Sequence, residues 1–141
     1  MTLNCLLLMK LITRDSDYAM RALCVMAQEI GKILSVDDIS LETKVPRSFL
    51  RKILQALSKR KIIKSYKGKD GGFLLLKNPD GISFIDIIEI FQGNFALTEH
   101  KLGKDKCPKI KRCNLKKRLD KIEKSLSGDL KLITVASILD R

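Results

Sequence analysis

Residues 45–75 read VPRSFLRKILQALSKRKIIKSYKGKDGGFLL, and this segment carries the strongest structural signal in the chain. Its first half has apolar residues at helical spacing, and Pro46 suits the first turn of a helix because its missing N–H would be unpaired there. The expected buried face consists of Phe49, Leu50, Ile53, Leu54 and Leu57. The second half changes to two short β-prone runs around KGKDGG, a sequence typical of hairpin turns. The segment therefore predicts a helix followed by a β-hairpin.

Two further helices are predicted ahead of this segment. Between Asp17 and Ile30 apolar residues recur at spacings of three and four, and Gly31 suits the end of a helix. Ser35 then precedes a run with early acidic residues, which is typical of a helix N-terminus. This short helix and the one after Pro46, joined by a tight turn, form a helix-turn-helix pattern, and the hairpin that follows makes it a winged helix.

Positive charge is concentrated in the same part of the chain. The 141 residues include 28 Lys and Arg against 16 Asp and Glu, a formal charge of +12. Residues 45–77 contain ten of the basic residues and one acidic residue, whereas residues 78–98 contain three acidic residues and no basic one. A field of this sign attracts polyanions, so nucleic acid or an anionic membrane surface leads the list of partners. The longest apolar run, Thr2–Met9, is far shorter than the roughly 20 residues that span a bilayer.

The C-terminal half is expected to contain two more helices. The first lies in residues 82–93, and four apolar residues are expected to pack it on the preceding helices: Ile82, Ile85, Ile88 and Phe91. The second begins near Asn114 and has apolar residues at spacings of 4, 3 and 4, a coiled-coil pattern: Leu115, Leu119, Ile122 and Leu126. Such a seam needs a partner, so we expect a homodimer, with packing back onto the same domain as the alternative. Gly128 is expected to interrupt this helix, and the LITVASIL segment after it to cover apolar surface.

These features divide the chain into three parts. We expect residues 1–8 to be an extension ahead of a second start at Met9, and residues 9–81 to form a winged helix-turn-helix DNA-binding domain. Residues 82–141 are expected to hold a connecting helix, a cysteine loop (98–113) and a dimerisation helix. The fold class is mainly α with a small β-hairpin (α+β). Four cysteines in a Lys-rich chain without a convincing export signal indicate the reducing cytoplasm.

Four segments of the chain together resemble the Rrf-two family of bacterial winged-helix transcription regulators. They are MKLITRDSDYAMRAL (9–23), residues 45–75, CPKIKRC (107–113) and TVASIL (134–139). The resemblance extends over about residues 9–139, and the family includes regulators of the IscR, NsrR and CymR types. It implies a dimer that binds an imperfect palindrome in promoters, with the recognition helix in the major groove and the wing in the minor groove.

The resemblance also implies which residues meet DNA. Five fall where the family's recognition helix contacts bases and phosphates: Arg47, Ser48, Phe49, Arg51 and Lys52. Three lie at the tip of the wing: Lys67, Gly68 and Lys69. Relatives commonly have Arg-Gly where this chain has Lys67-Gly68. Because Lys is less favoured than Arg in a narrow minor groove, weaker sequence preference is expected there.

Cluster-binding relatives place three cysteines ahead of the dimerisation helix, and this chain departs from that pattern. Cys107 and Cys113 keep one of the family's intervals, but the position of the first cysteine is Lys101. The neighbouring His100 and, from the other subunit, Asp17 are the remaining ligand candidates. Two thiolates, an imidazole and a carboxylate suit a 2Fe-2S cluster. The alternatives are a thiol switch formed by the two cysteines, and a loop without any sensor.

We therefore predict a dimeric DNA-binding transcription regulator, a repressor that senses redox state, nitric oxide or iron–sulfur status. One alternative is a cluster-free, CymR-like repressor controlled by a partner protein. Another is a winged-helix adaptor that binds protein or RNA. With one histidine and no nucleophile elbow or P-loop spacing, the sequence does not favour an enzyme. Cys24 lies on the apolar face of its helix and is expected to be buried as a small hydrophobe.

Overall fold

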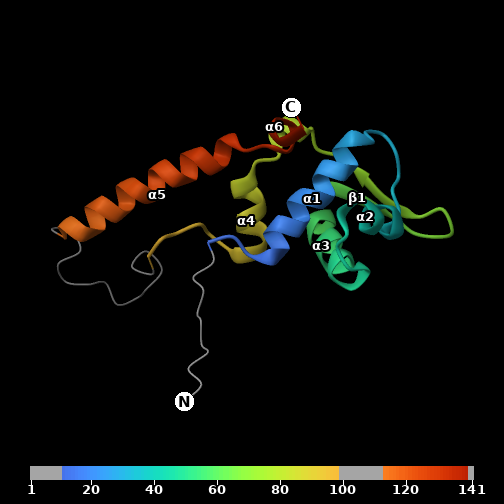
Figure 1. The fold of residues 1–141 in the computed structure, drawn as a ribbon, viewed down its shortest axis with the longest axis horizontal. Coiled ribbons are helices and arrows are strands. Elements are labelled where there is room, and N and C mark those ends of the chain that lie inside the picture. Colours follow the sequence, from blue (N-terminus) through green and yellow to red (C-terminus); the bar gives the residue numbers. More distant parts are fainter. Residues whose placement is uncertain (1–10, 99–112, 140–141) are drawn as a thin grey trace, which may run out of the picture.

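The fold is a helical domain with one β-hairpin and a long projecting helix (Figure 1). The computed structural model describes residues 11–98 and 113–139. In chain order the elements are α1 (Arg14–Gln28), α2 (Val36–Thr43), α3 (Arg47–Lys59), β1 (Ile63–Tyr66), β2 (Gly72–Leu75), the 3-10 turn η1 (Pro79–Gly81), α4 (Phe84–Gln92), α5 (Asn114–Leu132) and α6 (Val135–Leu139). The predicted fold class, mainly α with a small hairpin, is confirmed.

Helix α1 forms the centre of the core and packs against α2, α3, α4 and α6. Its small and apolar residues Ala19, Ala22 and Leu23 are completely buried, so the neighbouring helices approach it closely. The helix ends at Gln28, before Gly31, whose φ is +81°. Ile30, which the spacing placed on the buried face, therefore lies beyond the helix and is 68% exposed.

Two serine caps fix where α2 and α4 begin. Ser35 accepts a hydrogen bond from the N–H of Asp38, whose carboxylate accepts in return from the Ser35 N–H. Ser83 and Asp86 form the same reciprocal pair at the start of α4. Each pair satisfies backbone donors that a helix start leaves free. The hydrogen bonds from the side chain and then the backbone of Ser35 hold the pKa of the Asp38 carboxyl below its usual value.

The hairpin pairs β1 with β2 in antiparallel register, from Ile63 opposite Leu75 to Tyr66 opposite Gly72. Leu34, ahead of α2, adds an isolated bridge to Phe73 and so ties the hairpin to the helix-turn-helix. A Cβ on Gly72 would lie 2.3 Å from the Leu34 carbonyl oxygen, and one on Gly71 would lie 2.4 Å from that of Tyr66. Packing within the chain itself therefore requires this glycine pair.

Helix α4 is apolar on two sides. Ile87 is completely buried in the main core, whereas Ile85 and Ile88 form a second cluster with Leu130 of α5. The expectation that Ile85 and Ile88 pack on the first three helices is therefore wrong, because α5 covers that side of α4. Thr134 pairs with Ser83 in an isolated bridge, which places α6 against α1.

Helix α5 runs without a break for 19 residues and projects away from the rest of the molecule (Figure 1). The expected interruption at Gly128 is wrong. A single glycine disfavours a helix only modestly, and the apolar residues on either side hold the helix on α4. Within residues 11–98 and 113–139, no helix is long and apolar enough to cross a membrane.

Candidate nucleic-acid interface

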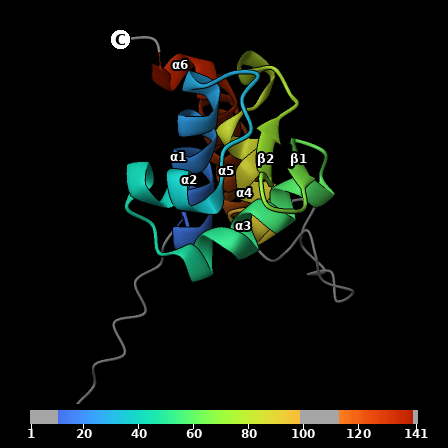
Figure 2. The same ribbon diagram turned by 90° about the vertical axis from the view of Figure 1, so that its right-hand side faces the viewer.

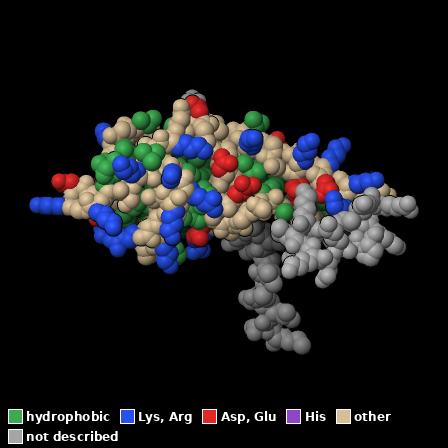
Figure 3. All heavy atoms as spheres, turned by 180° about the vertical axis from the view of Figure 1, so that it is seen from behind, with side chains coloured by type: hydrophobic (Ala, Val, Ile, Leu, Met, Phe, Trp, Pro, Cys, Tyr) green, Lys and Arg blue, Asp and Glu red, His purple; other side chains and the backbone are tan. Residues whose placement is uncertain are grey.

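Helix α3 divides cleanly into a buried and an exposed face. Its core side is formed by Leu50, Ile53, Leu54 and Leu57, each at most 2% exposed. Arg47, Arg51 and Lys52 lie on the exposed side. Figure 2 shows α3 crossing the lower part of the domain with the hairpin beside it. Basic side chains gather at this end of the molecule in the space-filling view (Figure 3). The arrangement presents a cationic helix that a nucleic-acid groove can receive.

Phe49 was expected both on the buried face of this helix and at the DNA surface, and the first expectation is wrong. Its side chain is 42% exposed, and its ring contacts Tyr18 edge to face with 6.5 Å between centroids. Phe49 lies about 100° around the helix from Leu50, at the margin of the apolar face. Ser48 beside it is exposed as well.

The turn between α2 and α3 is held by side-chain hydrogen bonds. The Ser40 hydroxyl donates to the Val45 carbonyl at 2.7 Å, and Thr43 Oγ1 accepts from the Val45 N–H at 3.3 Å. Lys44 takes the left-handed conformation with φ 57°, and Val45 is 2% exposed. These contacts fix the position of α3 relative to α2.

An ion pair joins the two helices on the exposed side. Nε of Arg47 lies 2.7 Å from Oδ1 of Asp37, and both side chains remain more than half exposed. Arg47 was expected at the DNA surface from the sequence, whereas its pairing with Asp37 was not. The two residues are ten positions apart across a turn, so helical periodicity carries no signal for their pairing.

The tip of the wing is fully accessible. Lys67, Gly68 and Lys69 are exposed, and Gly68 has φ +106° with open space around the position a Cβ would take. The Gly71 N–H donates to the Gly68 carbonyl at 3.1 Å, which closes the turn. Of the wing glycines, Gly68 is the one that lies free at the tip, whereas Gly71 and Gly72 serve the hairpin's own packing.

The candidate metal ligands are only partly described. Cys107 and His100 lie outside the described residues. Cys113 is a free, half-exposed thiol directly before α5. Asp17 lies on α1 and pairs with Arg21 at 3.0 Å. Among the described residues no three metal-ligating side chains come together.

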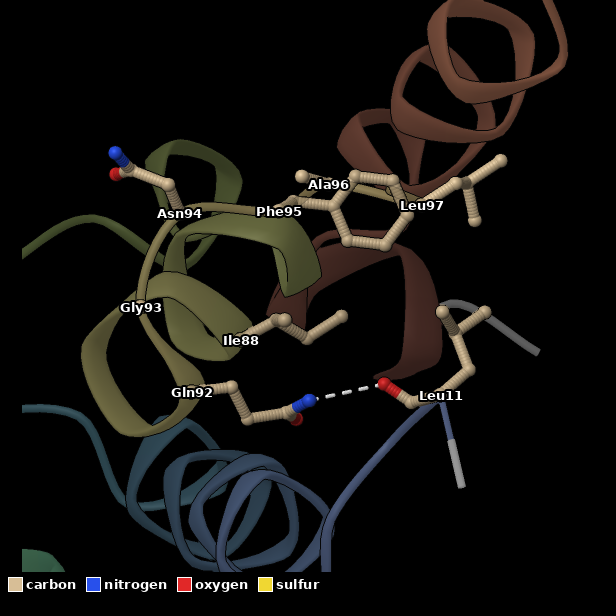
Figure 4. Close-up of a pocket in the computed structure, with 8 residues that line it drawn as sticks. All are labelled: Leu11, Ile88, Gln92, Gly93, Asn94, Phe95, Ala96 and Leu97. Carbon is tan, nitrogen blue, oxygen red and sulfur yellow. Dashed lines mark hydrogen bonds between the residues drawn. The ribbon is translucent and has the colours of Figure 1, made fainter. Parts of the chain in front are cut away.

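Gln92 links the end of α4 to the start of α1, and the sequence analysis missed it. Its Oε1 accepts from the Ser16 hydroxyl at 2.8 Å and from the Thr13 N–H at 3.1 Å. Its Nε2 donates to the Leu11 carbonyl at 3.0 Å, as Figure 4 shows beside a cavity of about 290 Å³. These contacts span about 80 residues of sequence, so no local pattern indicates them.

The apolar stripe of α5 is only partly covered. Leu126 packs on the cluster formed with α4, whereas Leu115 and Ile122 are 66% and 54% exposed. Leu119 between them is half-buried. The outer part of the stripe therefore has no apolar cover within the described part of the chain.

The family model for Rrf2, described as an iron-dependent transcriptional regulator, matches residues 12–141. That match includes all the elements described above. The chain belongs to the Rrf2 family.

Two relatives of this chain are named as putative helix-turn-helix transcriptional regulators. One from Aquifex aeolicus is 45% identical over 74 residues, which are 52% of this chain and 51% of that protein. One from Lactococcus lactis, YffB, is 35% identical over 104 residues, 69% of this chain and 65% of that protein. The matched part thus spans about half of the Aquifex relative.

The fold of this chain is similar to the solved structures of two family members, one of the IscR type and one of the CymR type. T. potens IscR has a TM-score of 0.70 and 26% identity over 91% of this chain and 85% of that one. CymR of B. subtilis, also at TM-score 0.70, is 23% identical over 90% of this chain and 94% of that one, and shows the shared fold. The family is one of transcriptional regulators, so the expectation of a protein that is not an enzyme is confirmed.

Proposed function

We propose that the protein is a cytoplasmic, homodimeric repressor that reads an imperfect palindrome in promoters. Residues 9–81 form the DNA-binding domain in this proposal. The observation that carries it is the exposed basic side of α3 next to the basic tip of the wing. Family membership favours this regulator over an adaptor for protein or RNA.

Helix α3 is the proposed reader of the major groove. The groove is about 12 Å wide and admits one α-helix. Arg51 is suited to pair bidentately with guanine, because its guanidinium presents two parallel donors. Lys52 is suited to a phosphate oxygen, which a point charge binds without sequence preference. Arg47, Ser48 and Phe49 lie on the same exposed side.

The wing is the proposed contact with the adjacent minor groove. Lys67 and Lys69 flank Gly68 at the exposed tip. Cationic side chains are attracted into a narrow minor groove by its negative potential. Lysine there supports affinity more than sequence choice.

Dimerisation is proposed through α5. A helix of 19 residues that leaves Leu115 and Ile122 more than half exposed supports a second copy as its cover.

Sensing is proposed through the cysteine loop, residues 98–113, which ends at Cys113. Thiolate, imidazole and carboxylate donors fit a 2Fe-2S cluster, with Cys107, Cys113 and His100 from one chain and Asp17 from its partner. A bound cluster would supply a redox-sensitive group. In this chain the half-exposed position of Cys113 before α5 connects its ligation state to the dimerisation helix.

The sensor is tested by purifying the protein anaerobically, recording its visible absorption and assaying iron and sulfide. The expected result is colour with matched iron and sulfide, lost in Cys107→Ser. A colourless, iron-free protein after attempted reconstitution would contradict the cluster and favour a thiol switch or control by a partner protein.

The DNA-reading function is tested by selection from duplexes with a randomised centre. The expected product is an enriched imperfect palindrome, bound more tightly than random duplex at the same salt concentration. Equal binding to random duplex and double-stranded RNA, with no enrichment, would contradict it.

A further inference from the structure

Asp37 places a negative charge on the surface that the proposed function turns towards DNA. It lies in the first turn of α2, and its side chain is 59% exposed. Phosphates repel a carboxylate, so this residue weakens non-specific binding. An exposed ion pair also contributes little to folding stability. A carboxylate in the first turn suits the N-terminus of α2, but that role does not require it to pair with Arg47.

The geometry of the pair leaves most of the Arg47 guanidinium available. Asp37 engages Nε at 2.7 Å, the nitrogen nearest the aliphatic part of the side chain. The two terminal amino groups remain for other acceptors, and together they match the O6 and N7 atoms of guanine. A carboxylate on Nε also restricts the rotamers of a long side chain that would otherwise be free.

Hydrogen bonds and burial hold the turn that carries this pair. Ser40 and Thr43 both hydrogen-bond to Val45, and the buried Val45 anchors the turn. Arg47 follows as the first residue of α3. The distance between the two helices is therefore set before any DNA is bound, and the pair is preformed.

We propose that Asp37 is a positioning residue that sets sequence specificity. It holds Arg47 ready for guanine, which raises the affinity for the selected duplex only. Its charge weakens binding to every duplex alike. Specificity is a difference between two affinities, and the positioning of Arg47 increases that difference. The inference rests on the proposed DNA-reading function and names a determinant of it.

The test compares variants on two probes, the duplex that the wild-type protein selects and a random duplex of equal length. Asp37→Ala removes both charge and acceptor, whereas Asp37→Asn removes the charge and keeps an oxygen acceptor. Glu42→Ala is the matched control, an exposed carboxylate on the same helix. Asp37→Ala is also made in the Arg47→Ala background.

Asp37→Ala is expected to lower the ratio of selected to random affinity about tenfold, within the range that one bidentate arginine–guanine pair supplies. Glu42→Ala is expected to raise both affinities by the same factor. Asp37→Asn is expected to retain most of the ratio. In the Arg47→Ala background, removal of Asp37 is expected to leave the ratio unchanged.

An equal rise on both probes for Asp37→Ala, as in the control, would overturn the inference while leaving the proposed function intact. So would the same fall in the ratio with and without Arg47. Wild-type protein that selects no sequence at all would overturn the proposed function, and the inference with it.

Discussion

At the residue scale, Arg51 and Lys69 lie in one basic surface but have different chemistry. Arg51 presents a planar fork on α3, whereas Lys69 presents a point charge at the tip of the wing. A planar fork can match the hydrogen-bonding atoms of one base, whereas a point charge binds any phosphate equally well. In the proposed function the two residues therefore contribute separately, Arg51 to sequence specificity and Lys69 to overall affinity.

Arg51→Ala is expected to reduce the preference for the selected duplex by about 1–3 kcal/mol, because a bidentate base contact is lost. Lys69→Ala is expected to weaken all duplexes alike and to lower the salt slope of binding by about one unit. Binding titrations at several salt concentrations measure both. Equal effects of the two variants on selected and random DNA would show that α3 is not the reading helix.

At the element scale, periodic signals in the sequence predicted more of the fold than of the site. Helices α1 to α5, the hairpin and the cap at Ser35 follow from local patterns, and the structure contains all of them. Local patterns did not predict which side of α4 packs on which part of the core. Ile85 and Ile87 are equally apolar, and only the position of α5 assigns them to different clusters. The Asp37–Arg47 contact crosses a turn, and the Gln92–Leu11 contact joins residues 81 positions apart, so no local pattern predicts either.

The uninterrupted α5 makes Gly128 a site for stabilisation. Gly128 is exposed within the helix, and nothing lies within 4 Å of a Cβ placed there. Gly128→Ala is expected to raise the free energy of unfolding by about 0.5–1 kcal/mol. Gly31→Ala serves as the contrast, since its φ of +81° strains any side chain and should lower stability. Denaturant unfolding of both variants measures whether the free energy of unfolding rises for Gly128→Ala and falls for Gly31→Ala.

The cap of α2 gives a pH-dependent signature. The pKa of Asp38 is lowered in the folded protein by its hydrogen bonds with Ser35. The ionised carboxylate therefore stabilises the folded protein fully at pH values above its ordinary pKa of 3.8. It is lost as the pH falls through the lowered value. Asp38→Asn is therefore expected to destabilise the protein at about pH 6, and its difference from the wild type should be smaller at about pH 3. Melting curves that differ by the same amount at both pH values would contradict this role.

At the scale of the whole molecule, the proposed reading of a palindrome requires two copies of the chain to bind together. One chain presents α3, one wing and a projecting α5 on which Leu115 and Ile122 are more than half exposed. A two-fold dimer would place two recognition helices on one face of the duplex, as a palindrome requires.

Ile122→Glu is expected to convert the dimer to monomer, because a charge would be buried without a partner at the joint. The association should weaken by about 3 kcal/mol or more, over a hundredfold. Lys124→Gln on the opposite side of α5 changes the net charge equally and should leave the dimer intact. Sedimentation equilibrium measures both. A wild-type monomer at micromolar concentration would contradict the proposed joint.

Hydroxyl-radical footprinting on the selected duplex shows whether paired winged helices read a palindrome. Two clusters of protected backbone are expected, related by two-fold symmetry and spaced by one helical turn of about 10 base pairs or a multiple of it. Ile122→Glu should lose both clusters at the same protein concentration. A single protected cluster, or uniform protection along the duplex, would contradict a dimer that reads a palindrome through paired winged helices.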